Sequence, residues 1–484
     1  MSEINKNKIE QILTALFEKW SGIVPENIES LPMSGSSRLY FRLSNNEHSA
    51  IGVYNDDKKE NLAFIKFTEN FKKSNLNVPK IYSENLDENC YLQEDLGNTT
   101  FFEFINQKRV GDDFTQEIVG VYKNVIDNLP LFQIVAGKTL DYSYCYPRSS
   151  FDQQSMEWDL NYFKYYFLKL SGIPFDEQKL EDNFQVFTKF LLNTESNYFL
   201  YRDFQSRNIM IHNDKPYFID YQGGRKGALQ YDIASLLYDA KANIPNAVRE
   251  ELLNYYILTL KKYIEVDEKE FKQSFYGFVL IRIMQALGAY GFRGFYEKKE
   301  HFLLSIPYAL ENLKHLLKII NFPVDVSYLL KIINDITNSE KLKSLNAGKK
   351  LKVVINSFSF HRGIPVDESG NGGGFVFDCR ALHNPGRYPE YKEVTGSDAP
   401  VIAFLEKEAD IKDFLTNVFS LVNQSVEVYS KRKFENLMIN FGCTGGQHRS
   451  VYCANQLAKY LSENFKNIDV IVRHREQEIK LKSL

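Results

Sequence analysis

The chain lacks the features that mark a secreted, zinc-binding or strongly charged protein. Its five cysteines form no CxxC pair, and its eight histidines do not cluster near them. This argues against a structural zinc site and favours a reducing cytoplasm. The first ten residues contain no apolar core of the kind that a secretory signal peptide needs, so we do not expect secretion. The formal net charge of −3 provides no general attraction to nucleic acid or to an anionic membrane.

Long apolar runs are also scarce. The most apolar one, residues 275–292, contains Arg282 and Gln285 and therefore predicts a buried helix rather than a membrane span. With 484 residues, 44% of them hydrophobic and 25% charged, the chain is expected to form two or three ordinary globular domains.

What the chain does contain is a spacing of polar residues typical of phosphoryl transfer. Asp203 lies five residues before Asn208, which fits a tight loop, and the apolar run 217–219 predicts a short strand that delivers Asp220. This chemistry needs one carboxylate to orient a substrate hydroxyl and accept its proton. It also needs an amide oxygen and a second carboxylate to hold Mg²⁺ against the nucleotide phosphates. We therefore predict Asp203 as the catalytic base and Asn208 and Asp220 as metal ligands. A polar hairpin without chemistry is the alternative.

The surroundings of this stretch predict two lobes. Residues 1–94 have the pattern of a small β-rich lobe after an opening helix, and residues 95–322 are mostly helical in pattern. Residues 91–97 predict a strand running into a connector whose backbone can bind a purine. The segment 231–237 predicts a helix with Asp232 as its N-cap.

A flexible turn precedes the alternating segment 37–43 in the first lobe. It consists of Ser34, Gly35 and Ser36. Such a turn can bring backbone N–H groups to phosphates, although an ordinary hairpin turn explains it equally well.

A boundary follows the helical lobe. Pro323 and the polar stretch 334–350 predict a linker over residues 323–350. The remainder, residues 351–484, alternates strand and helix patterns as a small α/β domain does.

A second phosphate-handling pattern lies in this last domain, at residues 440–450. A Gly-rich turn between a strand and a helix directs backbone N–H groups and the positive helix end at one point. Arg449 adds a charge-assisted clamp. The candidate anion-binding residues of this turn are Thr444, Gly445, Gly446, His448 and Arg449.

Two alternatives remain for this turn. One is a helix-capping loop without a ligand. The other is a cysteine-dependent phosphatase, because Cys443 and Arg449 form a C-x5-R pattern and Asp378 or Asp398 can serve as general acid. Against the phosphatase, Gly442 stands where such enzymes usually carry His.

About the first 320 residues resemble the aminoglycoside/choline phosphotransferase family, most closely its anomeric N-acetylmuramate/N-acetylglucosamine 1-kinase branch. The matching segments are 37–42, 93–97, 201–210, 218–222, 231–236 and 282–288. The resemblance implies a bilobal protein-kinase-like fold, ATP and Mg²⁺ as cofactors, and a small amino sugar as acceptor. It also implies the roles already given to Asp203, Asn208 and Asp220, and a nucleotide hinge that includes Glu94 and Leu96.

The chain departs from this family at two places. Tyr201 stands where such loops usually carry His, and the strand pattern 50–54 has no Lys to grip the nucleotide phosphates. Arg42, or Lys58 and Lys59, are the candidate substitutes. A non-catalytic regulator with a degenerate kinase domain is the alternative that this missing Lys motivates.

Residues 351–476 resemble the C-terminal domain of the RapZ family. The matching segments are 357–365, 376–380, 384–385, 395–396, 442–452 and 473–475. In that family the domain binds glucosamine-6-phosphate and can bind small RNA. The resemblance implies a pocket built from Arg380, Thr444, Gly445 and Arg449. Arg362 stands where the family often has His, which predicts a different ligand preference.

RNA binding is an open alternative for this domain. Its compact basic groups, residues 431–433 and 473–475, are explained equally well as solvated surface charge. The family's usual N-terminal P-loop domain is replaced here by the kinase-like part.

Together these observations predict an α+β chain with a bilobal protein-kinase-like fold followed by a smaller α/β domain. We expect a cytoplasmic amino-sugar kinase with a sensor domain for a phosphorylated amino sugar and no membrane partner. The oligomeric state is left open.

Overall fold

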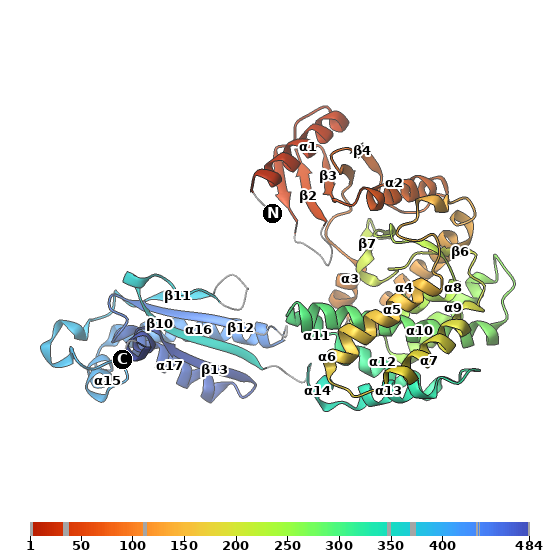
Figure 1. The fold of residues 1–484 in the computed structure, drawn as a ribbon. Coiled ribbons are helices and arrows are strands. Elements are labelled where there is room, and N and C mark those ends of the chain that lie inside the picture. Colours follow the sequence, from red (N-terminus) through yellow and green to blue (C-terminus); the bar gives the residue numbers. More distant parts are fainter. Residues whose placement is uncertain are drawn as a thin grey trace. The chain divides into compact units, whose positions relative to one another are not determined.

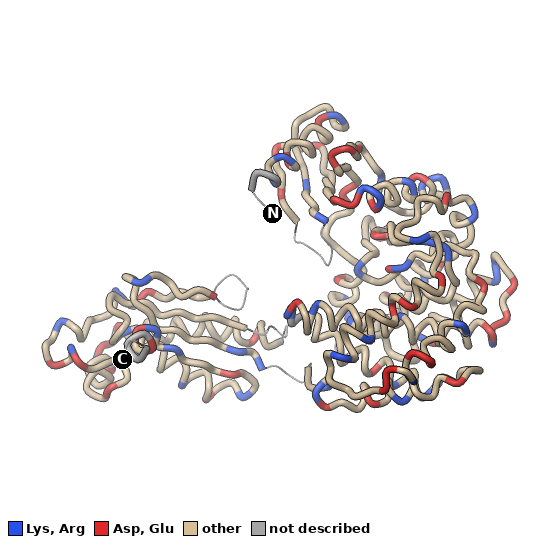
Figure 2. Tube along the Cα trace, viewed as in Figure 1, with Lys and Arg blue, Asp and Glu red and all other residues tan. Residues whose placement is uncertain are grey.

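The computed structural model describes residues 3–31, 38–109, 114–345, 350–367, 374–431, 434 and 436–482. The chain divides into two compact units, Met1–Asn346 and Ala347–Leu484 (Figure 1). In both units Lys and Arg alternate along the trace with Asp and Glu (Figure 2), in keeping with the small net charge.

The first unit begins with a five-stranded antiparallel sheet in the order β1-β2-β3-β5-β4. Its strands are β1 (Asn27–Ser30), β2 (Leu39–Ser44), β3 (Ser49–Tyr54), β4 (Ile81–Asn85) and β5 (Cys90–Glu94). Phe41 and Leu43 pack with residues of α1 (Glu3–Ser21) on one face. Val53 and Tyr91 pack with α2 (Lys58–Lys73) on the other. Successive side chains of a strand point to opposite faces of the sheet, so the strands contribute apolar residues to the cores on both faces.

The rest of the first unit is mainly helical. Its helices are α3 (Phe101–Lys108), α4 (Gln116–Pro130), α5 (Gln153–Phe163), α6 (Lys169–Ser171), α7 (Glu177–Leu192), α8 (Leu229–Leu237), α9 (Asn246–Leu260), α10 (Glu268–Gly291), α11 (Glu300–Leu303), α12 (Ile306–Ile319), α13 (Ser327–Asn338) and α14 (Glu340–Lys343). Two short antiparallel pairs lie among them: β6 (Tyr198–Leu200) with β9 (Arg225–Gly227), and β7 (Ile209–His212) with β8 (Lys215–Phe218).

Helix α10 contains the apolar run 275–292. With its continuation to Tyr296 it is long and apolar enough to cross a membrane by length and composition alone, but 67% of its most apolar window is buried inside the protein. Residues around its whole circumference, such as Phe275, Phe278 and Leu287, belong to the core. The burial agrees with the predicted core helix.

The predicted linker over residues 323–350 is wrong for most of its length. Residues 327–343 form α13 and α14, and Leu329, Ile332 and Ile336 are fully buried in the core of the first unit. Polar residues on the outer face made the segment look like a linker, although its apolar residues recur at helical spacing.

The second unit has a four-stranded parallel sheet in the order β11-β12-β10-β13. Its elements are β10 (Leu351–Ser359), β11 (Phe375–Asp378), α15 (Ala399–Leu405), α16 (Ala409–Lys431), β12 (Asn436–Cys443), α17 (Arg449–Asn464), β13 (Ile468–His474) and α18 (Arg475–Lys482). A separate core joins the sheet to α16 and α17. This separate α/β unit and the mixed sheet and helices of the first confirm the predicted fold class.

Candidate functional site

The first unit brings Asn208 and Asp220 into contact beside the backbone of Asp203. Asn208 ends a single 3-10 turn that leads into β7, and Asp220 follows β8 in the same hairpin. Asn208 Nδ2 donates to the Asp203 carbonyl oxygen at 2.9 Å and to Asp220 Oδ2 at 3.1 Å. Because both amide hydrogens are used in this way, Asn208 Oδ1 is the atom left to face another partner.

Asp220 has a left-handed backbone conformation, and its carboxylate is hydrogen-bonded to a neighbouring side chain. Its backbone has φ +67°, and Gln222 Nε2 donates to Asp220 Oδ1 at 2.7 Å. Displacement of water by the surrounding protein, and then the negative charge of Asp203, raise the pKa of Asp220. A non-glycine residue in the left-handed region costs of order 1–3 kcal/mol and is concentrated at functional sites.

Two arginines supply positive charge next to these carboxylates. Arg38, only 4% exposed, has Nη1 3.7 Å from Asp220 Oδ1 and donates from Nη2 to Glu60 Oε2 at 2.8 Å. Arg282 has Nη2 3.8 Å from Asp203 Oδ1 and donates from Nε to Ser235 Oγ at 3.0 Å. Arg38 was not among the predicted site residues, since nothing in the sequence links position 38 to position 220.

Oxygen atoms of the site fit a magnesium ion. Among the residues that the structure describes, no three His, Cys, Asp or Glu side chains gather into a metal cluster. A cation here would be held by Asn208 Oδ1 and Asp220, and completed by phosphate and water oxygens. Mg²⁺ commonly keeps several waters and binds through one or two carboxylates in this way.

Asp232 supports this site from α8, which corrects the predicted N-cap. The helix begins at Leu229 after Ala228, so Asp232 lies inside it and is completely buried. Asp232 accepts hydrogen bonds from the backbone N–H groups of Tyr201 and Arg202 at 2.9 and 3.0 Å, and from Gln133 Nε2 at 3.0 Å. Burial raises its pKa to about 7 despite these donors.

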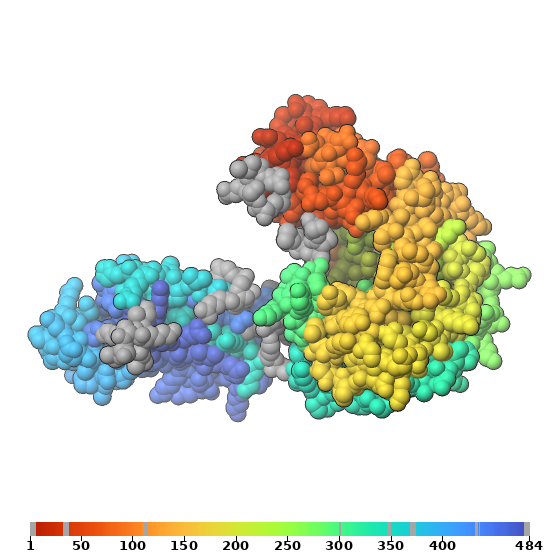
Figure 3. All heavy atoms as spheres, in the orientation of Figure 1, coloured from red at the N-terminus to blue at the C-terminus, as the bar shows by residue number. Residues whose placement is uncertain are grey.

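Tyr201 and Tyr221 fix the catalytic segment between the sheet and the helices. The Tyr201 hydroxyl donates to the Ile219 carbonyl at 2.6 Å. Tyr221 stacks on Phe64 of α2 with ring centres 4.8 Å apart, and its hydroxyl is hydrogen-bonded to Thr68. Figure 3 shows the surface of this unit hollowed between the red-to-orange sheet and the yellow-to-green helices.

The structure describes only some of the predicted nucleotide-binding residues. Ser34, Gly35 and Ser36 lie outside the described residues. Arg42 donates from Nε to Asp95 Oδ2 at 2.8 Å, so it braces the connector after β5.

The connector itself is partly occupied by bonds within the protein. The Leu96 carbonyl oxygen lies 3.1 Å from His212 Nδ1, and Glu94 Oε2 accepts from the Lys80 N–H at 3.0 Å. The other backbone groups of the connector remain the predicted hinge for a purine.

The anion cradle of the second unit is assembled by the turn between β12 and α17. Gly446 has φ +66°, and a Cβ there would meet the Ser359 backbone nitrogen at 2.8 Å, so glycine is required. Arg449 is 4% exposed and donates from Nη1 to the carbonyl oxygens of Arg380 and Leu382 at 2.9 and 2.8 Å. It therefore holds the segment 380–382 against the start of α17, with Nη2 3.5 Å from Thr444 Oγ1.

The remaining predicted residues of this cradle differ in their partners. His448 is buried, with Nε2 2.8 Å from the Tyr391 carbonyl. The exposed Arg380 binds Asp378 and lies over the Phe360 ring at 4.1 Å, and Arg362 pairs with Glu476 at 3.1 Å. A Cβ at Gly445 would meet nothing within 4 Å, so the turn is open there.

The phosphatase alternative gains no support from this geometry. Cys443 is the last residue of β12, is 3% exposed, and has its sulfur 3.1 Å from Ser450 Oγ. Reactive cysteines are usually partly exposed, whereas this thiol is buried.

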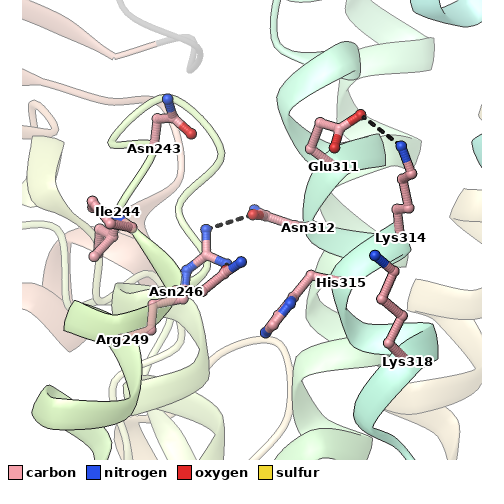
Figure 4. A pocket seen from close by; sticks show the side chains of 10 residues that line it. Asn243, Ile244, Asn246, Arg249, Glu311, Asn312, Lys314, His315 and Lys318 are labelled. Atoms are coloured by element: carbon pink, nitrogen blue, oxygen red, sulfur yellow. Dashed lines mark hydrogen bonds and ion pairs between the residues drawn. The ribbon is translucent and has the colours of Figure 1, made fainter. Parts of the chain in front are cut away.

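A cavity of about 270 Å³ lies elsewhere in the first unit, between the start of α9 and α12 (Figure 4). Its residues are Asn243, Ile244, Pro245, Asn246, Arg249, Glu311, Asn312, Lys314, His315 and Lys318. Arg249 caps the end of α8 by donating to the Leu237 carbonyl at 2.9 Å, and it binds Asn246 and Asn312. None of the predicted site residues lines this cavity.

Comparison with known proteins separates the chain in the same way. Residues 33–266 match the family model described as "Phosphotransferase enzyme family", and residues 351–478 match the "RapZ C-terminal domain". The chain joins a phosphotransferase-family segment to a RapZ C-terminal domain. Both predicted resemblances are thereby confirmed at the level of the family, and the amino-sugar kinase branch stays a prediction.

The curated relatives match through the RapZ C-terminal domain. A "Nucleotide-binding protein" of Actinobacillus pleuropneumoniae serotype 5b (strain L20) is 39% identical over 143 residues, which is 29% of this chain and 48% of the relative. The "RNase adapter protein RapZ" of Yersinia pestis bv. Antiqua (strain Angola) is 38% identical over 143 residues, with the same coverage. This chain thus spans about half the length of these relatives.

Solved structures match the phosphotransferase part. A choline kinase from Cryptosporidium parvum Iowa II is 13% identical, with a TM-score of 0.45, 67% of this chain covered and 99% of that chain. The ADP-bound aminoglycoside phosphotransferase APH(2'')-Ib is 12% identical, with a TM-score of 0.42, 70% of this chain covered and 98% of that chain.

Proposed function

We propose that the first unit is an ATP- and Mg²⁺-dependent kinase that phosphorylates a hydroxyl of a small amino sugar. The second unit would bind a phosphorylated amino sugar and act as a sensor. The convergence of Asp203, Asn208 and Asp220 at one end of the β7–β8 hairpin is the observation that supports the kinase most directly. The resemblance to the N-acetylmuramate/N-acetylglucosamine kinase branch supports the choice of acceptor.

Each side chain of the catalytic segment then has a defined task. Asp203 would orient the acceptor hydroxyl and take its proton as the oxygen attacks the γ-phosphorus. Arg282, 3.8 Å from Asp203, keeps a positive charge beside that carboxylate. Asn208 and Asp220 would hold the metal ion, which when bound neutralises charge on the phosphates.

For the second unit, the Gly-rich turn, the first turn of α17 and Arg449 support the binding of a phosphate group. The resemblance to the RapZ C-terminal domain supports glucosamine-6-phosphate as its ligand. RNA is the alternative ligand here.

The kinase proposal is tested by incubating the full chain with ATP and Mg²⁺ and a panel of acceptors. The panel contains N-acetylmuramate, N-acetylglucosamine, choline and an aminoglycoside, and the product is followed by ³¹P NMR. We expect transfer to an amino sugar, and we expect Asp203→Asn to lower the rate by ~10²–10⁴-fold, the usual contribution of a general base.

Nucleotide affinity of Asp203→Asn should stay close to that of the wild type, because Asp203 faces the acceptor. Transfer to choline alone would refute the amino-sugar acceptor. Absence of ATP consumption above background with every acceptor would favour the non-catalytic regulator instead.

A further inference from the structure

Strand β3 of this chain has no lysine to bind the nucleotide phosphates. In protein kinases a lysine on the third strand pairs with a glutamate of the neighbouring helix and contacts the nucleotide phosphates. Here β3 has the sequence Ser-Ala-Ile-Gly-Val-Tyr, with no cation. The helix that follows β3 nevertheless carries a glutamate, because Glu60 lies in the first turn of α2.

Arg38 is the cation that pairs with this glutamate. Its guanidinium donates from Nη2 to Glu60 Oε2 at 2.8 Å, while Nη1 lies 3.7 Å from Asp220 Oδ1. Leu39 at the start of β2 pairs with Tyr54 at the end of β3, so the residue before Leu39 enters the site from the strand next to β3. The guanidinium thus links α2 to the carboxylate assigned to the metal.

The three cations that the sequence offered as substitutes are directed elsewhere. Arg42 forks onto Asp95 at 2.8 and 3.1 Å and also donates to Asn98. Lys58 pairs with Asp87 at 2.9 Å, and Lys59 lies 5.6 Å from the centre of the Tyr146 ring. All three were candidate substitutes for the lysine, and the described residues show no hydrogen bond or ion pair between any of them and Asp220 or Glu60.

We infer that Arg38 binds the phosphate groups of a nucleoside triphosphate in place of the strand lysine, and that Glu60 positions it. This inference rests on the proposed kinase function, because it requires the nucleotide to occupy the same hollow. A guanidinium beside the carboxylate that would hold the metal is also beside the phosphates that this metal would neutralise. Its planar fork of N–H donors matches two phosphate oxygens, where a lysine would supply a single point charge.

Two ligands separate phosphate binding from base binding in the full-length protein. The β,γ-imido analogue of ATP (AMP-PNP) with Mg²⁺ is titrated by calorimetry, and adenosine, which has no phosphates, is titrated by ligand-observed NMR. Arg38→Met is expected to weaken AMP-PNP by about 10- to 100-fold, the scale of lost charged hydrogen bonds, and to leave adenosine within about twofold. Lys58→Met removes a cation of α2, the helix that carries Glu60, and should change neither affinity.

Two further variants guard against loss of the fold and test the positioning role. Arg38→Lys retains the charge without the fork and should lose a smaller factor for AMP-PNP only. Glu60→Gln should likewise weaken AMP-PNP without affecting adenosine, which a purely structural contact would not do selectively.

The outcomes distinguish this inference from the function on which it rests. Unchanged AMP-PNP affinity in both Arg38 variants, or equal losses for AMP-PNP and adenosine in folded variants, would overturn the role of Arg38. An equal loss in Lys58→Met would overturn it as well, since the effect would then reflect general charge. A wild-type protein that binds no AMP-PNP would overturn the kinase proposal itself.

Discussion

Arg202, the residue immediately before Asp203, connects the loop of this predicted catalytic base to helix α5. Both of its terminal nitrogens bind Asp159, at 2.9 and 2.6 Å, and its guanidinium lies over the rings of Phe151 and Tyr231. The backbone of Arg202 has φ +81°, a conformation that L-residues adopt at a cost and that its contacts have to maintain. The pair therefore fixes the loop from which Asp203 projects.

We expect Arg202→Met to destabilise the first unit by about 3–5 kcal/mol, since Asp159 is only 6% exposed and would lose its counterion. The double variant Arg202→Met with Asp159→Leu should recover part of this loss, because no buried charge remains unpaired. Urea unfolding of the wild type and of these variants measures both effects. The single variant Asp159→Leu completes the cycle. If the double variant loses as much stability as the two single variants lose together, the two side chains are not energetically coupled.

The residues whose convergence could be predicted are those that lie close together in the chain. Asp203, Asn208 and Asp220 belong to one loop and one hairpin, so their spacing alone predicted a shared site. Arg38 contacts Asp220, but the two residues are separated in the sequence by more than half of the residues of the first unit. No local pattern encodes such a pair, and the resemblance pointed only to a lysine that is missing.

At the scale of elements, α8 shows how a local pattern misled. An aspartate ahead of an apolar run usually caps a helix, and Asp232 was predicted to do so. The helix instead starts earlier, at Leu229, and Asp232 caps the backbone of a distant loop at Tyr201 and Arg202. These partners lie about thirty positions earlier in the sequence, whereas the rules for helix starts consider only the neighbouring residues.

Asp232 should make the stability of the first unit depend on pH. Its pKa of about 7 in the folded protein lies above the ~3.9 of an unfolded aspartate. Between these values the folded state binds more protons, so this contribution to stability is present below about pH 4 and is lost as pH rises through 7. The slope is at most about 1.4 kcal/mol per pH unit.

The variant Asp232→Asn removes this titration while retaining the shape of the side chain. At pH 5 it should be less stable than the wild type by about 1–3 kcal/mol, because the amide cannot accept from all three N–H donors. The gap between wild type and variant should narrow from pH 5 to pH 7.5 in urea unfolding at each pH. A gap that stays constant would mean that Asp232 does not titrate in this range.

The segment 323–350 was wrongly predicted as a linker although its sequence does contain the signal of a buried helix. Leu329, Ile332, Ile333 and Ile336 recur at the spacing of one helical face, and all four are buried. The signal was therefore present in the sequence but was outweighed by the polar composition of the segment. A search for periodicity would have assigned α13 to the first unit.

At the scale of the whole molecule, each unit has a core of its own. The helical core of the first unit extends to Leu342, and the core of the second begins at Leu351. Units with separate cores and separate ligands are expected to unfold in separate transitions. The two proposed sites can therefore be examined independently in the intact chain.

Calorimetry of the full-length protein should show two transitions, each raised by one ligand only. AMP-PNP with Mg²⁺ should raise the transition of the first unit, and glucosamine-6-phosphate that of the second. At a concentration of about 100 times Kd each ligand adds about 2.7 kcal/mol to the stability of its own unit, which raises the transition temperature by several degrees.

Arg449→Ala should reduce the response to glucosamine-6-phosphate, since loss of a charged hydrogen bond weakens binding by about 1–3 kcal/mol. This substitution also removes the hydrogen bonds to the carbonyls of Arg380 and Leu382, so it can lower the stability of the second unit itself. The transition of the first unit is the internal control and should not move. A shift of both transitions by either ligand would instead reveal thermodynamic coupling between the units.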